Sequence, residues 1–316
     1  MELIREILLA ERRIRPHLRE TPLERSLPLS RRAGAEVYLK LENFQHTGSF
    51  KARGAMNKIL AMEASCKPRG VVAASTGNHG AAVAFAAGRQ GIPSLIFVPE
   101  DAAPAKIEAM RLRGAEVRTW GSDCVLAEVR ARQYAAEQGM TYVSPYNDPQ
   151  VVGGQGTTGA EIARQIECLD SVFVALGGGG LIAGIAGYLK NLDPRVRVIG
   201  CSPVNSCVMA QSLKAGRILE LESRPTLSDG TAGGVEEGSI TFELCRVLID
   251  ECILVSEEEI AGALRFFIGA HHMLIEGAAA VAVAAFLKSA PALRGGRSLI
   301  VICGGNIGLD TLRSVI

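Results

Sequence analysis

Short β-rich runs alternate with alanine-rich helical patterns along almost the whole chain. The run GVVAAS at 70–75 precedes a helical pattern at about 80–89, and SLIFVP follows at 94–99. A strand, a helix and a second strand in this order form a parallel pair, because the helix carries the chain back across the sheet. The same alternation resumes at 171–176, 197–201 and 298–303. We therefore predict an α/β fold with mostly parallel sheets.

Composition supports this fold and excludes several classes of partner. Hydrophobic residues make up 48% of the chain and aromatic residues only 5%, so the core must consist mainly of Ala, Val, Ile and Leu. The 34 basic and 33 acidic residues leave a net charge of +1, which provides no electrostatic footprint for nucleic acid. The longest apolar run, at 277–287, is about half the length of a membrane span. We expect a small-molecule partner, no nucleic acid and no membrane.

The cysteines and the N-terminal residues indicate a cytoplasmic protein. The eight cysteines are scattered and show no C-x-x-C spacing, which is typical of reduced thiols and not of a disulfide framework or a zinc site. Residues 1–20 repeat apolar side chains at helical spacing with acids between them, unlike a secretory or transit segment. We expect an untargeted chain without a bound metal.

Ligands of parallel sheets bind in the loops at the carboxyl ends of strands. The string STGNHG at 75–80 follows a strand pattern and precedes a helix, so its backbone amides, with Ser75, Thr76 and Asn78, could hold a carboxylate. An ordinary N-cap turn is the alternative. CGGN at 303–306 follows the last strand pattern, and Cys303 is either a buried apolar residue or a weak hydrogen-bond partner for a ligand.

Two further strings are rich in glycine. GGGGLIAG at 177–184 would let the backbone approach a phosphate at the start of a helix, although a close-packed turn is the alternative. The cradle would consist of Gly177, Gly178, Gly179 and Gly180, with the helix starting near Leu181. GQGTTG at 154–159, which we place among these loops, matches G-x-G-x-x-G formally. It follows the turn-rich segment 144–150 and lacks a ribose-binding acid at the expected distance, so we do not interpret it as a dinucleotide site.

Lys51 lies in TGSFKARGA at 47–55, after a strand pattern and a turn, where a helix should begin. Pyridoxal 5'-phosphate requires a lysine for a Schiff base, a phosphate cradle, a group on its 3-oxygen and a partner for its ring nitrogen. Lys51, the four glycines, Asn78 and Cys303 supply one of each. The sequence therefore predicts a pyridoxal phosphate enzyme tethered through Lys51.

The strings TGSFKARGA, STGNHG, GQGT, GGGGLIAG and CGGN, in this order and at these separations, resemble the fold-type II pyridoxal phosphate enzymes. Within them the chain is similar to the branch of threonine/serine dehydratases and serine racemases, from TPL at 21–23 to CGGN. The resemblance implies a two-lobed, tryptophan synthase β-like architecture with a mostly parallel sheet in each lobe. Residues 1–69 and 148–316 would form the large cofactor-binding lobe and residues 70–147 a small mobile lobe. No C-terminal regulatory domain is expected.

The resemblance also implies roles for individual residues. Phe50 would pack on one face of the pyridine ring, and Asn78 would meet the 3-oxygen. Glu276 matches an acid near the cofactor, although a solvated helix-cap acid is the alternative. Asn147 and Gln155 match positions near the substrate. The loop expected to bind the substrate carboxylate consists of Ser75, Thr76, Gly77, Asn78 and His79.

The activity that the resemblance implies is the dehydration of threonine or serine to a 2-keto acid and ammonia. Lys51 would remove the α-proton of the substrate. Racemases of this branch use a serine on the face opposite the lysine, where this chain has Thr76, so a serine racemase is the alternative. Ala81 stands where relatives often carry a glutamine, which puts that polar contact in doubt.

Metal activation, substrate and assembly are further expectations from the resemblance. Ser202 and Val208 stand where metal-activated relatives place acids, so we expect no Mg²⁺ site. The strings STGNHG and 228–242 resemble dehydratases of hydroxyectoine utilisation, so a hydroxyectoine-derived substrate or 3-hydroxyaspartate is an alternative to threonine and serine. Homodimers are common among such enzymes, and we expect one here.

Overall fold

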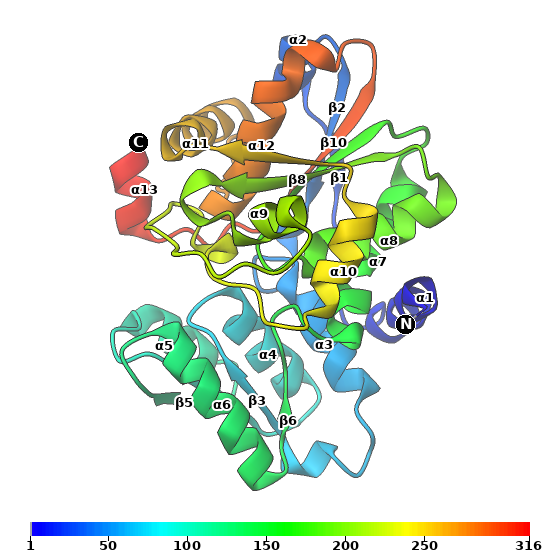
Figure 1. Ribbon diagram of the computed structural model, residues 1–316. Helices are drawn as coiled ribbons and strands as arrows, with labels where there is room; N and C mark the ends of the chain where they lie inside the picture. Colours follow the sequence, from blue (N-terminus) through cyan, green and yellow to red (C-terminus); the bar gives the residue numbers. More distant parts are fainter. Residues whose placement is uncertain (1) are drawn as a thin grey trace.

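The computed structural model describes residues 2–316 and contains two β-sheets (Figure 1). The six-stranded sheet has the order β1-β2-β10-β7-β8-β9, and the four-stranded sheet has the order β5-β4-β3-β6. The first sheet comprises β1 (Leu23–Arg25), β2 (Glu36–Leu41), β7 (Ser171–Ala175), β8 (Arg197–Pro203), β9 (Glu251–Val255) and β10 (Arg297–Ile302). The second comprises β3 (Val71–Ala74), β4 (Ser94–Val98), β5 (Glu116–Thr119) and β6 (Thr141–Tyr142).

The strand pairing confirms the prediction of an α/β fold with a mostly parallel sheet in each half. Every pair is parallel except β1 with β2. In the smaller sheet Leu95 of β4 stands opposite Val72 of β3 on one side and Glu116 of β5 on the other. The helices between these strands carry the chain back each time, as the alternating pattern requires.

Thirteen α-helices surround the two sheets in residues 2–316. They are α1 (Leu3–Ile14), α2 (Leu27–Ala33), α3 (Lys51–Ala61), α4 (Asn78–Arg89), α5 (Pro104–Arg111), α6 (Cys124–Gln138), α7 (Pro149–Gln165), α8 (Gly180–Leu192), α9 (Val208–Ala215), α10 (Ile240–Leu248), α11 (Glu257–His271), α12 (Gly277–Ser289) and α13 (Leu309–Val315). We call the four-stranded sheet with α4, α5 and α6 the small lobe, and the six-stranded sheet with α2 and α7–α13 the large lobe. In Figure 1 the small lobe lies below the large lobe, and α3 lies near their boundary.

The longest apolar run of the sequence forms helix α12, whose first ten residues, 277–286, are buried. A helix that is apolar on all sides belongs inside a core, and α12 packs against β7, β8 and β10. Among residues 2–316 no helix combines the length and the hydropathy that crossing a membrane requires.

The string GQGTTG is not a loop, contrary to the expectation from sequence, because it lies in the middle of α7. Its glycines serve helix packing. An ideal Cβ atom added to Gly184 of α8 would lie 2.5 Å from the backbone nitrogen of Gly156 in α7. The two helices therefore touch backbone to backbone, which only glycine permits. This placement supports the decision not to interpret GQGTTG as a dinucleotide site.

A fully buried ion cluster joins α3 to the large lobe. Arg53 of α3 donates paired hydrogen bonds to Glu42, at 2.7 and 2.8 Å, and to Glu161 of α7, at 2.7 and 2.7 Å. Lys40 of β2 also donates to Glu161 at 2.7 Å. Burial alone would raise the pKa of Glu161, but the charges of Arg53 and Lys40 outweigh it and hold this pKa below its ordinary value. Glu161 is thus ionised, and α3 cannot shift without separating it from Arg53.

We expect Arg53→Met to destabilise the fold strongly, because Glu42 and Glu161 would remain buried with fewer partners. Removing one partner of a buried ion pair costs about 3–5 kcal/mol. A urea titration followed by circular dichroism should give a lower midpoint for this variant. Arg246→Met is the matched control, since the ion pair of Arg246 with Glu243 is exposed, and its midpoint should equal that of the wild type. Equal midpoints for both variants would mean that the cluster does not hold the fold.

Candidate active site

The segment that precedes α3 is fixed against the end of strand β10. The backbone N–H of Phe50 donates to the carbonyl of Cys303 at 3.0 Å, and Ser49 forms an antiparallel bridge with Gly304. The helix then begins at Lys51, as the sequence predicts. Two of the predicted motifs, TGSFKARGA and CGGN, are therefore in direct contact.

The amine of Lys51 points toward the segment that links the two lobes. It donates a hydrogen bond to the carbonyl of Pro145 at 2.8 Å and lies 5.2 Å from the ring centroid of Phe50. Lys51 is partly exposed as a residue, but its amine is shielded from solvent. Burial lowers the pKa of this amine to about 8, although nearby Cys303 and Glu276 act in the opposite direction. An amine with such a pKa can serve as nucleophile and base.

Asn78, at the start of α4 in the small lobe, binds two residues of the large lobe. Its Nδ2 donates to both carboxylate oxygens of Glu276, at 2.9 Å each, and its Oδ1 accepts from Nδ2 of Asn306 at 2.6 Å. Glu276 is only 3% exposed, so the alternative that it is a solvated helix-cap acid is wrong. Burial raises the pKa of Glu276, and its hydrogen bond from Asn78 opposes this.

Cys303 completes this group at the end of β10. Its Sγ lies 4.0 Å from Oε1 of Glu276, and the residue is 1% exposed. Burial and the charge of Glu276 raise the pKa of the Cys303 thiol well above its ordinary value. The thiol is therefore neutral, as a weak partner for a ring nitrogen would be, and it is unsuited to act as a nucleophile.

The loop after β3 consists of Ser75, Thr76 and Gly77, because α4 begins at Asn78 and includes His79, two residues before the helix start that the sequence pattern predicts. The hydroxyl of Ser75 accepts the N–H of Gly77 at 3.1 Å, and Thr76 is half-buried. Nε2 of His79 lies 2.8 Å from the carbonyl of Val143, so this nitrogen carries the proton and donates it. Burial and the nearby Lys51 lower the pKa of His79 to about 3, which makes it neutral. The loop thus presents hydroxyls and backbone amides at the start of α4 without a permanent cation.

The glycine loop Gly177–Gly180 lies between β7 and α8. Gly179 has φ of 85°, a left-handed conformation that favours glycine, and it is the N-cap of α8. A Cβ atom on Gly178 would lie 2.5 Å from the ring of Tyr146, and one on Gly177 would lie 2.9 Å from the backbone of Thr231. Because side chains have no room here, backbone N–H groups are the natural donors, and Leu181 is buried behind them. This is the form of a phosphate cradle at a helix N-terminus.

The two remaining predicted residues lie at the edge of this group. Nδ2 of Asn147 donates to Glu236 at 3.0 Å, and Oδ1 of Asn147 accepts the N–H of Ile240 at 3.0 Å. Gln155 is buried in α7, where its Oε1 accepts the N–H of Gly54, one turn beyond Lys51 in α3. Gln155 therefore contacts the helix that carries Lys51, and its role toward substrate stays a prediction.

Several residues of the site were not singled out from the sequence. Asn306 ends the string CGGN, which predicts no role for it, although its amide donates to Asn78 and to the carbonyl of Thr47. Pro145 and Tyr146 belong to the turn-rich segment 144–150, from which the sequence predicts no role in the site. Thr241, which donates to the carbonyl of Gly178 at 2.6 Å, carried no local signal because it is far from the glycine loop in sequence.

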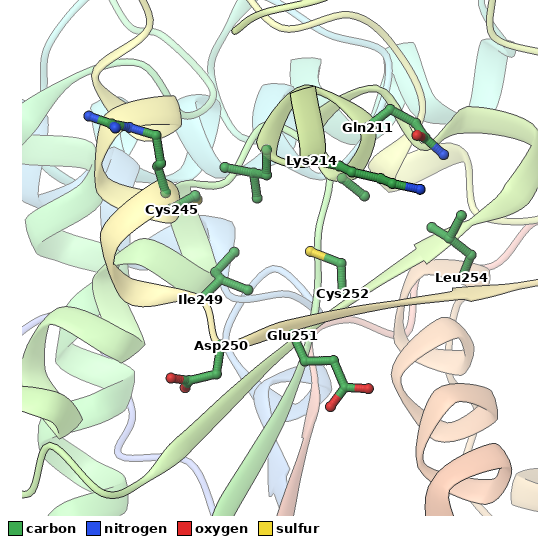
Figure 2. Close-up of a pocket in the computed structure, with 11 residues that line it drawn as sticks. Gln211, Lys214, Cys245, Ile249, Asp250, Glu251, Cys252 and Leu254 are labelled. Carbon is green, nitrogen blue, oxygen red and sulfur yellow. The ribbon is translucent and has the colours of Figure 1, made fainter. Parts of the chain in front are cut away.

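A separate cavity of about 440 Å³ lies at the outer edge of the six-stranded sheet, between α9, α10 and β9 (Figure 2). Gln211, Lys214, Cys252 and Leu254 are among its lining residues, and the figure shows them around the opening. The predicted site residues do not line this cavity.

Residues 2–316 contain no group of three or more metal-ligating side chains. Ser202, at a position where metal-activated relatives are expected to place an acid, donates its hydroxyl to the carbonyl of Leu176.

Comparisons with known proteins agree with the geometry. Residues 14–304 match the family model described as pyridoxal-phosphate dependent enzyme. The L-threonine ammonia-lyase of Thermotoga maritima is 42% identical over 313 residues, which cover 99% of this chain and 78% of that protein. The threonine deaminase isoform 2 of Solanum lycopersicum superposes with a TM-score of 0.93 at 32% identity, covering 99% of this chain and 91% of the other. Maize serine racemase superposes with a TM-score of 0.92 at 31% sequence identity, and the match covers 98% of this chain and 95% of that chain.

The chain belongs to the family of pyridoxal-phosphate dependent enzymes, and it has the two-lobed fold-type II architecture that its motifs predict. Its residues fit the cofactor: a shielded amine of lowered pKa at Lys51, a side-chain-free glycine cradle at the start of α8, and a neutral thiol at Cys303. Lys51 would hold pyridoxal phosphate covalently, and the glycine loop would hold its phosphate.

We expect the amine of Lys51 to become reactive near pH 8 in the cofactor-free protein. Its pKa is lowered, so the unprotonated fraction grows with pH and reaches half at about pH 8, whereas an ordinary lysine has a pKa of 10.5. The measurement is the pH dependence of acetylation by acetic anhydride, with each lysine quantified by mass spectrometry and normalised to its own maximum. Lys106, whose side chain is exposed on α5, is the internal reference. A Lys51 profile that coincides with an ordinary lysine would contradict the desolvation argument.

Proposed function

We propose that the protein is an ammonia-lyase that dehydrates L-threonine, and L-serine as a second substrate, to a 2-keto acid and ammonia. The observation that carries the proposal is the amine of Lys51, which donates to the carbonyl of Pro145, has a pKa lowered by burial to about 8, and is close enough to His79 for its charge to lower the pKa of that residue. The names of similar proteins support it, since the relative from Thermotoga maritima is an L-threonine ammonia-lyase and the structure from Solanum lycopersicum is a threonine deaminase.

Each residue then has a defined task. Bound pyridoxal phosphate supplies an electron sink that acidifies the α-proton of the amino acid and activates its β-hydroxyl as a leaving group. The free amine of Lys51 removes the α-proton, for which a pKa near the working pH is well suited. Hydroxyls and amides of Ser75–His79 bind the substrate carboxylate. Because the small lobe carries this loop, closure of the lobes would exclude water from the reacting atoms.

A serine racemase is the second candidate function, since maize serine racemase has the same fold. The feature that favours it is Thr76, whose hydroxyl could exchange a proton on the face opposite Lys51. The methyl group of threonine crowds that face more than a serine would, so elimination is the reaction that we favour.

The activities named for the relatives support threonine and serine over 3-hydroxyaspartate and a hydroxyectoine-derived substrate.

Boundaries, location and assembly are also part of the proposal. We divide the chain into a large lobe of residues 1–69 and 148–316 and a small mobile lobe of residues 70–147. The division is supported by the sheets, since β3–β6 form one sheet and the remaining strands form the other.

A cytoplasmic location is supported by the eight cysteines, which are all free thiols. A homodimer is proposed by analogy with such enzymes.

Lys51→Ala should abolish catalysis, because the tether and the base are lost together. General base catalysis alone contributes about 10²–10⁴-fold. The measurement is release of 2-keto acid and ammonia by cofactor-loaded protein from L-threonine, L-serine, D-serine and 3-hydroxyaspartate. Lys58→Ala, on the same helix, is the matched control and should retain activity. Normal turnover by Lys51→Ala would refute the assignment, and turnover of 3-hydroxyaspartate above that of threonine would refute the substrate argument.

Thr76→Ala should leave elimination nearly unchanged while removing any racemisation. If Thr76 transfers a proton, its loss lowers racemisation by about 10²-fold or more. Chiral chromatography of the unreacted serine, together with the keto-acid assay, measures both reactions in one sample. A complete loss of elimination would show that this hydroxyl takes part in dehydration.

A further inference from the structure

Segment 216–239 joins α9 to α10 and contains a single short 3₁₀ helix, Asp229–Thr231. Figure 1 shows this yellow-green segment running along the boundary between the large and small lobes. Four of its five glycines, at 216, 233, 234 and 238, would place an added Cβ atom in open space. Nothing in its local sequence pattern explains why it should stay in this position.

Contacts of Glu236 fasten this segment to the small lobe. Oε1 of Glu236 lies 2.9 Å from Nη2 of Arg132 in α6, and Oε2 accepts from Nδ2 of Asn147 at 3.0 Å. The backbone N–H of Glu236 donates to the hydroxyl of Tyr146 at 3.0 Å. The side chain of Glu236 is 28% exposed, so these contacts are partly sheltered from water.

The same contacts lead to the reacting amine. Tyr146, whose hydroxyl binds Glu236, places its ring against Gly178 of the phosphate cradle. Its neighbour Pro145 accepts the hydrogen bond from Lys51. Segment 144–147 is thus held on one side by Glu236 and contacts Lys51 and the glycine loop on the other.

We propose that Glu236 is a positioning residue. Through Arg132 and Asn147 it holds segment 216–239 on the small lobe, and it thereby keeps segment 144–147 in contact with the active site. The kinetic effects that this proposal predicts rest on the proposed function, because they concern turnover of threonine. Glu236 does not touch the reacting atoms. Glu236 stabilises the arrangement in which the segment before α10 lies on the small lobe and segment 144–147 lies against the active site. Its loss therefore weakens substrate binding more than it slows the chemical step.

The test compares Glu236→Gln, Arg132→Gln and the double variant with the wild type, all loaded with cofactor. Each single substitution should raise KM for L-threonine about threefold to tenfold, the range expected for a partly exposed ion pair with a hydrogen bond, with kcat within about twofold. The double variant should be no worse than Glu236→Gln alone, because Arg132 acts on this segment through Glu236. Glu236→Asp should recover part of the loss.

Two controls separate this contact from a general change of charge. Glu237→Gln removes the same charge from the adjacent, exposed position, and Glu128→Gln removes the other ion-pair partner of Arg132 while leaving Glu236 in place. Both controls should keep the KM of the wild type.

Hydrogen–deuterium exchange provides a readout that does not depend on turnover. Peptides covering 144–147 and 228–240 should exchange faster in Glu236→Gln and in Arg132→Gln than in either control. Unchanged exchange in these peptides would overturn the proposal. Faster exchange with an unaltered KM would reduce Glu236 to a structural residue and also overturn it. If the wild type fails to turn over any β-hydroxy amino acid, the proposed function fails, and exchange alone decides whether the clamp exists.

Discussion

The ion cluster around Arg53 is the constraint on which the remaining structure depends. Charged groups from β2, α3, α7 and the turn after β2 meet out of contact with water, where any one of them alone would be strongly unfavourable. Because the cluster requires all of these elements at once, it fixes α3 relative to the six-stranded sheet. Arg53 lies two residues after Lys51, so the same charges that join the elements also set the position from which the reactive amine projects. Stability and catalysis thus share one short helix.

The site is divided between the two lobes by the geometry of parallel sheets. Loops that follow β3, β7 and β10 supply Asn78, the glycine loop and Cys303, because parallel strands end at the same edge. Asn78 comes from the small lobe and binds Glu276 and Asn306 of the large lobe, so its hydrogen bonds connect the lobes at the cofactor position. Several groups of the site carry no full charge at neutral pH. His79 and Cys303 are neutral, and burial lowers the pKa of Lys51 to about 8.

Local patterns in the sequence were sufficient for the parallel sheets, the start of α3 at Lys51 and the loops that begin at residues 75, 177 and 303. These features depend on residue periodicity and on glycine, which act over short distances along the chain. The sequence did not show that Glu276 is buried, because an acid before an alanine-rich helix has the pattern of an exposed N-cap. It did not identify Asn306 or Glu236 either, since their partners lie 228 and 89 positions away in the chain. GQGTTG was misplaced because its glycines match a loop pattern, whereas tertiary packing of α7 on α8 decided its structure.

The backbone contact between Gly156 and Gly184 affects how this family of sequences can vary. A position where two helices touch through their main chains accepts no side chain on either partner, whatever ligand the protein binds. A mutational scan would therefore find Gly154, Gly156 and Gly159 as intolerant as the glycines of a nucleotide-binding loop, and an alignment of descendants would preserve them. Invariant glycines in this string would reflect the close approach of α7 and α8. Inferring a ligand from it would confuse a demand of packing with a demand of chemistry.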